Sequence, residues 1–368
     1  MSGITKIPFF GVDRQYNNIR EEILDISDQV YQSGQVLDGT YTQNFERTIA
    51  KMTERGHAVS VNSGTMALVF ALRAVDFYSI YKKDKVLVPA QSFAATGNAI
   101  IEAGMEPVFC DVDPITGLMD INSIPVEPDE LAAILYVNLF GNVINWDKLQ
   151  TYKNYWNTHN IPIIEDAAQS FGAYYNSVPS GKLGDISCLS FDPTKNLNNY
   201  GSGGMLLTDD LDFAELVRSF RNNGKDHNYA VTGVNSRMSE VDCAQMLLKL
   251  KYFDSWQNRR SLIADYYTEE LDGYVDIIPV DSKVDHAWSK YVIHHRARSG
   301  IKDHLRDFGV ESRIHYEQPL HILDSMGAHS VLEGAEEFSR TCLSLPIYPE
   351  LTDSEVEYIV GCIKEYTF

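Results

Sequence analysis

Short apolar runs recur along the first part of the chain, and stretches with helical periodicity separate them. Val, Ile and Leu occupy both faces of most runs, as in strands that helices cover on both sides. The first helical stretch, Thr65–Val75, has its apolar residues at the spacing i, i+3, i+4, i+7. The seven predicted strands are His57–Val61, Lys85–Pro89, Pro107–Asp111, Ala132–Val137, Pro162–Glu165, Ile186–Phe191 and Gly203–Leu207.

This alternation of strands and helices predicts an α/β fold, with a large domain built on a mainly parallel seven-stranded sheet between helices. After about residue 255 the pattern changes, which predicts a smaller C-terminal α+β domain. We therefore expect a large domain over residues 1–254, including the N-terminal segment and ending near the helix Ser239–Tyr252, and a small domain over residues 255–368. The predicted elements of the small domain are the helices Trp256–Leu271, Lys302–Phe308 and Ser354–Tyr366 and the extended pieces Asp276–Pro279 and Ser289–His295.

Composition and charge narrow the classes of partner. Of the 368 residues, 44% are hydrophobic and 22% charged, which is ordinary for a soluble globular protein. The formal net charge of −20 repels nucleic acid and anionic membranes over most of the surface, so we expect neither as a partner. A phosphate-bearing ligand would need a local positive site. With no signal-peptide pattern and no membrane-spanning segment, a cytoplasmic location is expected.

The cysteines and the paired acidic residues point to neither disulfides nor a metal. The five cysteines are scattered and none has CxxC spacing, so we expect buried, reduced thiols. Asp111 and Asp113 end a predicted strand, but no His or further carboxylate accompanies them at useful spacing. No metal site is predicted.

Two polar segments follow predicted strands, where ligands bind in open α/β sheets. Asn62–Thr65 opens a helix with small residues, whose backbone N–H groups suit an anion, although the same residues are typical of an N-cap. Glu165 and Asp166 end a buried strand, so at least one carboxylate needs a partner. An ionised Asp166 would keep a heteroaromatic nitrogen protonated, as an electron-sink cofactor requires; helix capping is the open alternative.

Two further segments contain basic side chains. Lys195 closely follows a predicted strand, on a loop with Pro193 and closing glycines, and is a candidate Schiff-base amine. A solvated surface lysine is the alternative. Arg237 precedes a helix that Ser239 is expected to cap. Its guanidinium could bind phosphate or carboxylate, or lie on the surface without a ligand.

In this order, the segments resemble the nucleotide-sugar aminotransferases of the DegT/DnrJ/StrS group, which are fold-type I enzymes dependent on pyridoxal 5′-phosphate (PLP). The resemblance runs from about Ile7 to the C-terminus. It rests on the segments NSGTMAL, VLVPAQSFAATGNAI, GMEPVFCDVDP, IIEDAAQSFGA, LSFDPTKNLNNYGSGGMLLTDD, GVNSRMSEVDCAQM, IHYEQPLH and LSLPIYPELT.

The resemblance implies a role for each matching residue. Lys195 would hold PLP as a Schiff base and transfer protons, while Asp166 would pair with the pyridinium nitrogen. Phe93 would stack on the ring, and Gln169 would lie near its 3′-oxygen. The residues implied to hold the phosphate are Ser63, Gly64, Thr65 and Ser190, together with the partner subunit's Asn235. Those implied to meet the nucleotide-sugar are Arg237, His315 and Tyr316.

The implied activity is transfer of an amino group from L-glutamate to a keto-sugar carried on a nucleotide, in amino-sugar and polysaccharide biosynthesis. A homodimer with shared active sites is also implied. The segment FDPTKN resembles relatives that act on 3-keto sugars, so amination at C3 is expected rather than at C4. A cyclitol (inosose) aminotransferase and a non-catalytic PLP-binding regulator are the alternatives. Sugar 3-dehydrases have His at the Schiff-base position, so Lys195 argues against that reaction.

The chain departs from the family pattern at four places. Phe171 stands where many relatives have His, Asp192 differs from the S-F-H pattern, and Tyr348 replaces a usual His. The stretch Phe77–Lys83 is longer than the usual turn and is interpreted as a surface change. The change at Asp192 alters the expected surroundings of proton transfer.

Overall fold

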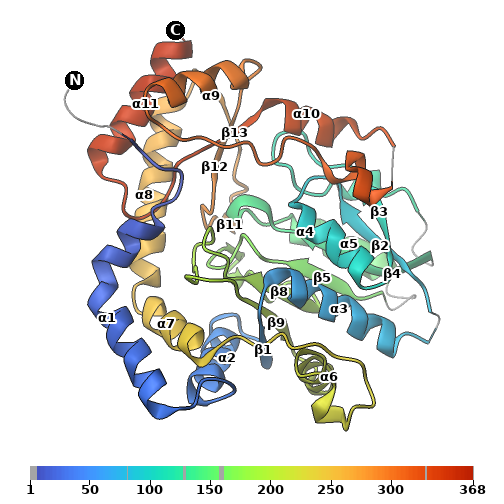
Figure 1. The fold of residues 1–368 in the computed structure, drawn as a ribbon. Helices are drawn as coiled ribbons and strands as arrows, with labels where there is room; N and C mark the ends of the chain where they lie inside the picture. Colours follow the sequence, from blue (N-terminus) through green and yellow to red (C-terminus); the bar gives the residue numbers. More distant parts are fainter. Residues whose placement is uncertain (1–5, 81, 127–129, 157–160, 328–329, 368) are drawn as a thin grey trace.

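The computed structural model describes residues 6–80, 82–126, 130–156, 161–327 and 330–367 (Figure 1). A seven-stranded sheet has the order β1-β9-β8-β5-β4-β2-β3. The pairs from β8 to β3 are parallel, whereas β9 is antiparallel to both neighbours, so the predicted mainly parallel α/β class is confirmed. The strands are β1 His57–Val61, β2 Lys85–Pro89, β3 Glu106–Cys110, β4 Leu131–Val137, β5 Ile163–Asp166, β8 Ile186–Ser190 and β9 Gly204–Thr208.

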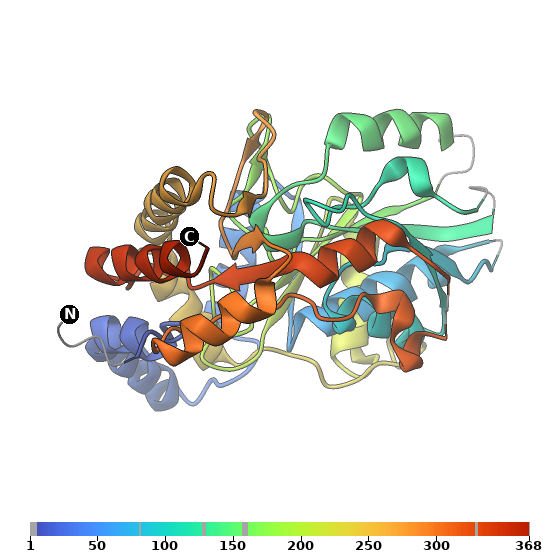
Figure 2. The ribbon, with the colours of Figure 1, turned by 90° about the horizontal axis from the view of Figure 1, so that it is seen from above.

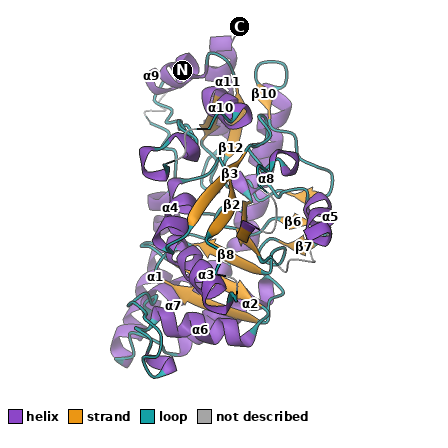
Figure 3. Cartoon of the chain, turned by 90° about the vertical axis from the view of Figure 1, so that its right-hand side faces the viewer, coloured by secondary structure: helices purple, strands orange, loops and turns teal. Residues whose placement is uncertain are grey.

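Helices cover both faces of this sheet. Ala133, Leu135 and Val137 of β4 pack into one apolar cluster, with residues of α3, α4 and α6. Ile134 and Tyr136 pack into a second cluster, with Leu149 of α5. Alternate residues of a strand point to opposite faces, so β4 is buried on both. Figure 3 shows α3 and α4 on one side of the strands and α5 on the other. These helices are α3 Gly64–Tyr78, α4 Ala94–Glu102, α5 Trp146–Trp156 and α6 Leu211–Arg221.

Three further helices pack beside the sheet: α1 Val12–Ser33, α2 Thr40–Met52 and α7 Glu240–Leu250. The predicted helix Ser239–Tyr252 corresponds to α7, and Ser239 caps it by accepting a hydrogen bond from the Asp242 amide. Helices α1 and α2 are not among the predicted elements. Only four of the 22 residues of α1 are buried, so its apolar stripe is narrow and the sequence pattern is weak.

The C-terminal part contains the predicted helices and a small antiparallel sheet, β10-β12-β13. Helices α8, α9 and α11 pack on this sheet in one apolar cluster (Figures 1 and 2). The elements are α8 Phe253–Leu271, β10 Asp276–Ile277, β11 Val284–Asp285, β12 Tyr291–His294, α9 Arg298–Asp307, α10 Glu333–Thr341, β13 Cys342–Leu345 and α11 Asp353–Thr367.

Several contacts cross the predicted domain boundary, and two of them involve secondary-structure elements near it. Strand β11 pairs with β6 (Tyr174–Tyr175), which forms a hairpin with β7 (Val178–Pro179). Helix α8 packs its first residue, Phe253, into an apolar cluster with Phe171, and packs Ile263 into the C-terminal cluster. The division at residues 254 and 255 stays a prediction.

The cysteines match the expectation. Cys110, Cys188, Cys243, Cys342 and Cys362 are all buried and unpaired. Separately, none of the helices among the described residues combines the length and apolar character needed to cross a membrane.

Candidate active site

A cavity of about 290 Å³ opens at the carboxyl ends of the central strands. Its lining includes Val137, Asp166 and Ser190, the last residues of β4, β5 and β8. Strand ends of a parallel sheet meet at one edge, which is where ligands bind in this class of fold. The cavity brings together ten of the twelve predicted site residues: Ser63, Gly64, Thr65, Phe93, Asp166, Gln169, Ser190, Lys195, His315 and Tyr316.

Asp166 lies buried at the base of the cavity. The Thr96 hydroxyl donates to its Oδ2 over 2.8 Å, and the Ala168 amide donates to its Oδ1 over 3.1 Å. Burial raises the pKa of Asp166, while these donors and the charge of Lys195 act in the opposite direction. A cationic ring nitrogen facing this carboxylate would add to the interactions that keep it ionised.

Lys195 lies on a tight loop directly after β8. Its amide donates to the Asp192 carbonyl over 2.9 Å. The Asp192 carboxylate accepts from the Thr194 amide and hydroxyl, over 3.0 and 2.6 Å. Asp192 therefore shapes the loop that presents the lysine. Burial lowers the pKa of Lys195, which favours the neutral, nucleophilic amine.

The N-terminus of α3 forms a second wall of the cavity. Ser63 caps the helix, because its hydroxyl accepts from the Met66 amide over 3.2 Å. The first N–H groups of a helix have no intrahelical partner, so those of Gly64 and Thr65 suit an anion. A β-carbon on Gly64 would lie 2.7 Å from Cβ of Ser190, and one on Gly204 would lie 2.3 Å from the Ser63 carbonyl carbon. Glycine thus permits the helix to approach the strands.

Aromatic and amide side chains line the remaining wall. Gln169 accepts from the Phe140 amide over 3.1 Å and donates to the Tyr316 hydroxyl over 3.0 Å, which fixes its orientation. Phe93 is 54% exposed, with its ring centroid 5.8 Å from that of Tyr316. His315 Nδ1 hydrogen bonds with the Ser344 hydroxyl, and burial lowers the pKa of His315 to about 3. Its imidazole is therefore neutral near neutral pH.

The residues present fit PLP. The glycine-lined helix terminus suits the phosphate and Asp166 suits the ring nitrogen, while the amine of Lys195, in the lining of the same cavity, suits an aldehyde. No group of three or more His, Cys, Asp or Glu residues that could hold a metal occurs in the described part of the chain.

Residues 17–364 match the model of the DegT/DnrJ/EryC1/StrS aminotransferase family. The chain belongs to this family. The aminotransferases of this family depend on PLP, and this chain is an aminotransferase.

Similar proteins include both a named transaminase and a named regulator. The "pleiotropic regulatory protein" of Geobacillus stearothermophilus is 32% identical, over 98% of both chains. The dTDP-3-amino-3,4,6-trideoxy-alpha-D-glucose transaminase of Streptomyces venezuelae is also 32% identical, over 98% of this chain and 96% of that protein. The crystal structure of S. venezuelae DesV in complex with a ketimine intermediate has a TM-score of 0.92 at 30% identity, covering 98% of both chains.

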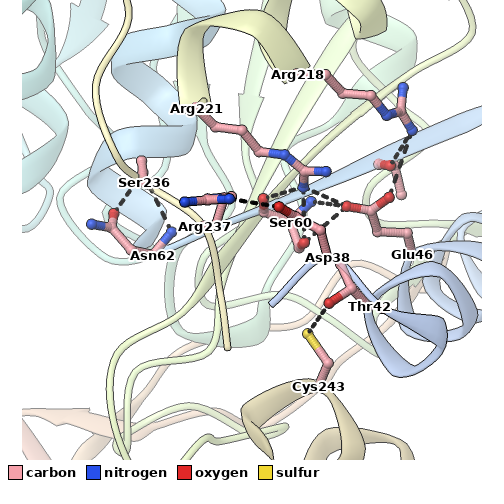
Figure 4. Close-up of polar contacts among 12 residues, drawn as sticks. Asp38, Thr42, Glu46, Ser60, Asn62, Arg218, Arg221, Ser236, Arg237 and Cys243 are labelled. Carbon is pink, nitrogen blue, oxygen red and sulfur yellow. Dashed lines mark hydrogen bonds and ion pairs between the residues drawn. The ribbon is translucent and has the colours of Figure 1, made fainter. Parts of the chain in front are cut away.

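Two predicted site residues of this aminotransferase, Asn235 and Arg237, do not line the cavity of their own chain. Arg237 forms an ion pair with Asp38 over 2.6 Å, as Figure 4 shows. Between them in sequence, the buried Ser236 donates to the Asn62 side chain over 2.8 Å, and its carbonyl accepts from the Asn62 amide. The loop is thus attached directly beside the α3 terminus, with Asn235 exposed.

The cavity lining also includes polar and aromatic residues that the sequence did not indicate, among them Phe10, Thr96, Lys290 and Arg313. Thr96 follows Phe93 by three residues and Arg313 precedes His315 by two, so proximity to a motif was an available signal for both. Phe10 and Lys290 lie outside the segments that carry the family resemblance.

Of the departures from the family pattern, only Asp192 lines this cavity among the described residues. Phe171 packs on Phe253 with ring centroids 5.0 Å apart, and Tyr348 is buried beneath the Arg14 guanidinium. In the stretch Phe77–Lys83, Phe77 and Ile80 are exposed, which agrees with a surface change; Tyr81 lies outside the described residues.

Proposed function

We propose that this aminotransferase moves an amino group from L-glutamate to C3 of a keto-sugar carried on a nucleotide. The cavity supports the proposal, because it combines a partly buried lysine, a buried carboxylate and a helix terminus suited to an anion. The Streptomyces relative is named for a product aminated at position 3 of a dTDP-linked sugar. That relative supports both the nucleotide carrier and the ring position.

Lys195 is the base and acid of the proposed reaction. It accepts the proton from the α-carbon of the amino donor and later returns a proton to the former carbonyl carbon of the sugar. Its lowered pKa suits this exchange, because the amine gives and takes a proton more readily near neutral pH. When bound, PLP supplies an electron sink that stabilises the carbanion.

The other residues of the proposed site hold and orient the cofactor and the substrate. Asp166 would pair with the ring nitrogen of the cofactor and keep it protonated, Phe93 would stack on the ring, and Gln169 would contact the 3′-oxygen. The cofactor phosphate would be held by Ser63, Gly64, Thr65 and Ser190. His315 and Tyr316 meet the nucleotide-sugar from within the same chain.

A homodimer completes the proposed site, with the partner subunit's Asn235 at the phosphate and the partner subunit's Arg237 at the nucleotide-sugar. Two observations support this arrangement. Neither side chain lines the cavity of its own chain, and Asn235 is exposed. Closed two-fold pairing is also the commonest symmetry of oligomers.

A half-reaction screen tests the substrate. The enzyme is first converted with L-glutamate to its pyridoxamine form, and keto-sugar nucleotides and inososes are then added one at a time. The acceptor that restores the visible absorption of the lysine-bound cofactor identifies the substrate, and NMR of the product locates the new amine. A preferred inosose, or an amine at C4, would overturn the corresponding part of the proposal. If L-glutamate does not convert the cofactor and no acceptor reacts, the alternative of a non-catalytic PLP-binding regulator is favoured.

A further inference from the structure

Besides Lys195, two cationic side chains line the cavity, Lys290 and Arg313. Lys290 directly precedes β12, and Arg313 exchanges backbone hydrogen bonds with Ser344 of β13. Both therefore come from the C-terminal part of the chain. The helix terminus assigned to the cofactor phosphate comes from α3, so these two cations belong to a different wall.

Lys290 is buried, with 6% of its surface exposed. Its ammonium donates to the carbonyls of Ser289 and Thr194, over 2.9 and 3.3 Å. No carboxylate of the described residues forms an ion pair with it. Burial, followed by the charge of Lys195, lowers the pKa of Lys290 well below its ordinary value. An anion beside it would stabilise the charged form.

Arg313 lies over two aromatic rings. Its guanidinium carbon is 4.9 Å from the ring centroid of Phe10 and 5.2 Å from that of Phe9. Lys290 Nζ lies 5.1 Å from the same Phe10 centroid, so the two cations are within about 10 Å of each other. No side-chain ion pair of Arg313 occurs in the described ranges. A guanidinium stacked on a ring keeps its N–H edge free to bind an oxyanion.

The two carboxylates of the cavity have other partners. Asp166 accepts from Thr96 and Ala168, and Asp192 accepts twice from Thr194. Neither forms an ion pair with Lys290 or Arg313 among the described contacts. In a protein with net charge −20, two cations concentrated at one wall of a cavity indicate an anionic ligand group at that wall.

We propose that Lys290 and Arg313 form a subsite for a substrate carboxylate, carried by the amino donor or by an acidic sugar. The subsite rests on the proposed function, because it assigns part of a substrate to the same cavity. Lys290 contacts the carbonyl of Thr194, the residue before Lys195. A carboxylate of the amino donor bound at the subsite would therefore lie on the side of the cavity where Lys195 lies.

Calorimetric titration of the PLP-loaded enzyme tests the subsite with two unreactive probes, glutarate for the donor and D-glucuronate for an acidic sugar. Lys290→Met and Arg313→Gln should each weaken binding of one probe about tenfold or more, because each removes a charged hydrogen-bond donor. Arg313→Lys, which keeps the charge, should restore most of the affinity. Lys283→Met is the matched control, since Lys283 is an exposed lysine paired with Asp147 outside the cavity lining.

The probe whose affinity falls in the variants shows whether the carboxylate belongs to the amino donor or to an acidic sugar. Unchanged affinity for both probes in the variants, or binding of neither probe by the wild type, would overturn the subsite. Loss of PLP itself from Lys290→Met or Arg313→Gln would also overturn it, by assigning the cations to the cofactor. If Lys290→Met does not fold, the probe affinities of the two Arg313 variants test the subsite alone, since Arg313 is exposed. Attachment of PLP to Lys195 is measured separately, so failure of the subsite is distinguishable from failure of the proposed function.

Discussion

Gly64, the first residue of α3, packs directly against Ser190, the last residue of β8. A β-carbon on Gly64 would lie 2.7 Å from Cβ of Ser190, closer than side-chain carbons approach in folded proteins. The lack of a side chain therefore allows the helix terminus to meet the strand end. The N–H groups of the helix and the loop that begins at Phe191 then face the same cavity.

Gly64→Ala should lower both stability and PLP affinity, because Ser190 or the helix must move. Overpacking of this kind costs about 1–3 kcal/mol. Urea unfolding and PLP titration measure the two effects. Gly361→Ala is the control: Gly361 is in α11 with open space around it, so alanine should raise stability by about 0.5–1 kcal/mol. Unchanged PLP affinity in Gly64→Ala would contradict the proposed binding of the cofactor phosphate at the N-terminus of α3.

Lys195→Ala should abolish the yellow colour of the purified enzyme while the fold survives, because no other amine is expected to hold the cofactor. Borohydride reduction of the wild type and peptide mapping locate the attached lysine directly. Lys290 is the informative alternative, since it lines the same cavity. A label on Lys290 or on any other lysine would refute the assignment.

Asp166→Asn should keep the cofactor and lose most transamination, because a neutral amide no longer holds the ring nitrogen protonated. A charged hydrogen bond is worth about 1.5–3 kcal/mol in the ground state, and the rate effect should be larger as charge builds on the ring. Thr96→Val is the matched variant, since it removes the donor to Oδ2 and leaves the charge. Steady-state rates of the two are compared; near-normal turnover of Asp166→Asn would exclude the role.

Mixing Lys195→Ala subunits with Arg237→Ala subunits should recover about a quarter of wild-type activity. Half of the randomly paired dimers are mixed, and each has one undamaged site if Arg237 serves the partner's cavity. If Arg237 serves its own cavity, every site carries one lesion and no activity returns. Exchange of chains is verified independently with tagged subunits. Failure to recover would remove the shared site and leave the chemistry of Lys195 intact.

Lys249→Met should make stability less dependent on pH. Lys249 is fully buried, donates to the Asn198 carbonyl over 2.8 Å, and has a pKa lowered by burial from 10.5 to about 7. As pH falls from about 10 to 7, the unfolded chain binds a proton that the folded chain does not. Wild-type stability should therefore fall by about 1.4 kcal/mol per pH unit from this group, and level off below pH 7.

Urea unfolding at pH 7 and pH 10 measures this dependence. The free energy of unfolding of Lys249→Met minus that of the wild type should be larger at pH 7 than at pH 10. Lys251→Met, at the exposed end of α7, is the control and should show the same difference at both values. A difference for Lys249→Met that is equal at the two pH values would exclude the buried lysine as the cause.

The sequence by itself determined the seven strands, the α/β class and most of the cavity. Runs such as Ile186–Phe191 are apolar on both faces, and only a strand between two layers buries both. Four residues of the proposed site lie at or just after the ends of strands: Ser63, Asp166, Ser190 and Lys195. The carboxyl ends of parallel strands meet at one edge of a sheet. Local order in the chain was therefore enough to predict that they come together.

Only the tertiary structure decided which distant residues join them. The apolar pattern of β9 indicates that the strand is buried, but not whether it runs parallel or antiparallel to its neighbours. Its antiparallel pairing was therefore not predictable from the sequence pattern. Lys290 and Arg313 reach the cavity because the C-terminal sheet packs beside it, a relation that no local pattern carries. The pairing of Arg237 with Asp38 is likewise set by the packing of α2 against α7, about 200 residues apart in sequence. Side-chain partners of this kind depend on which surfaces meet, and only the packed chain determines that.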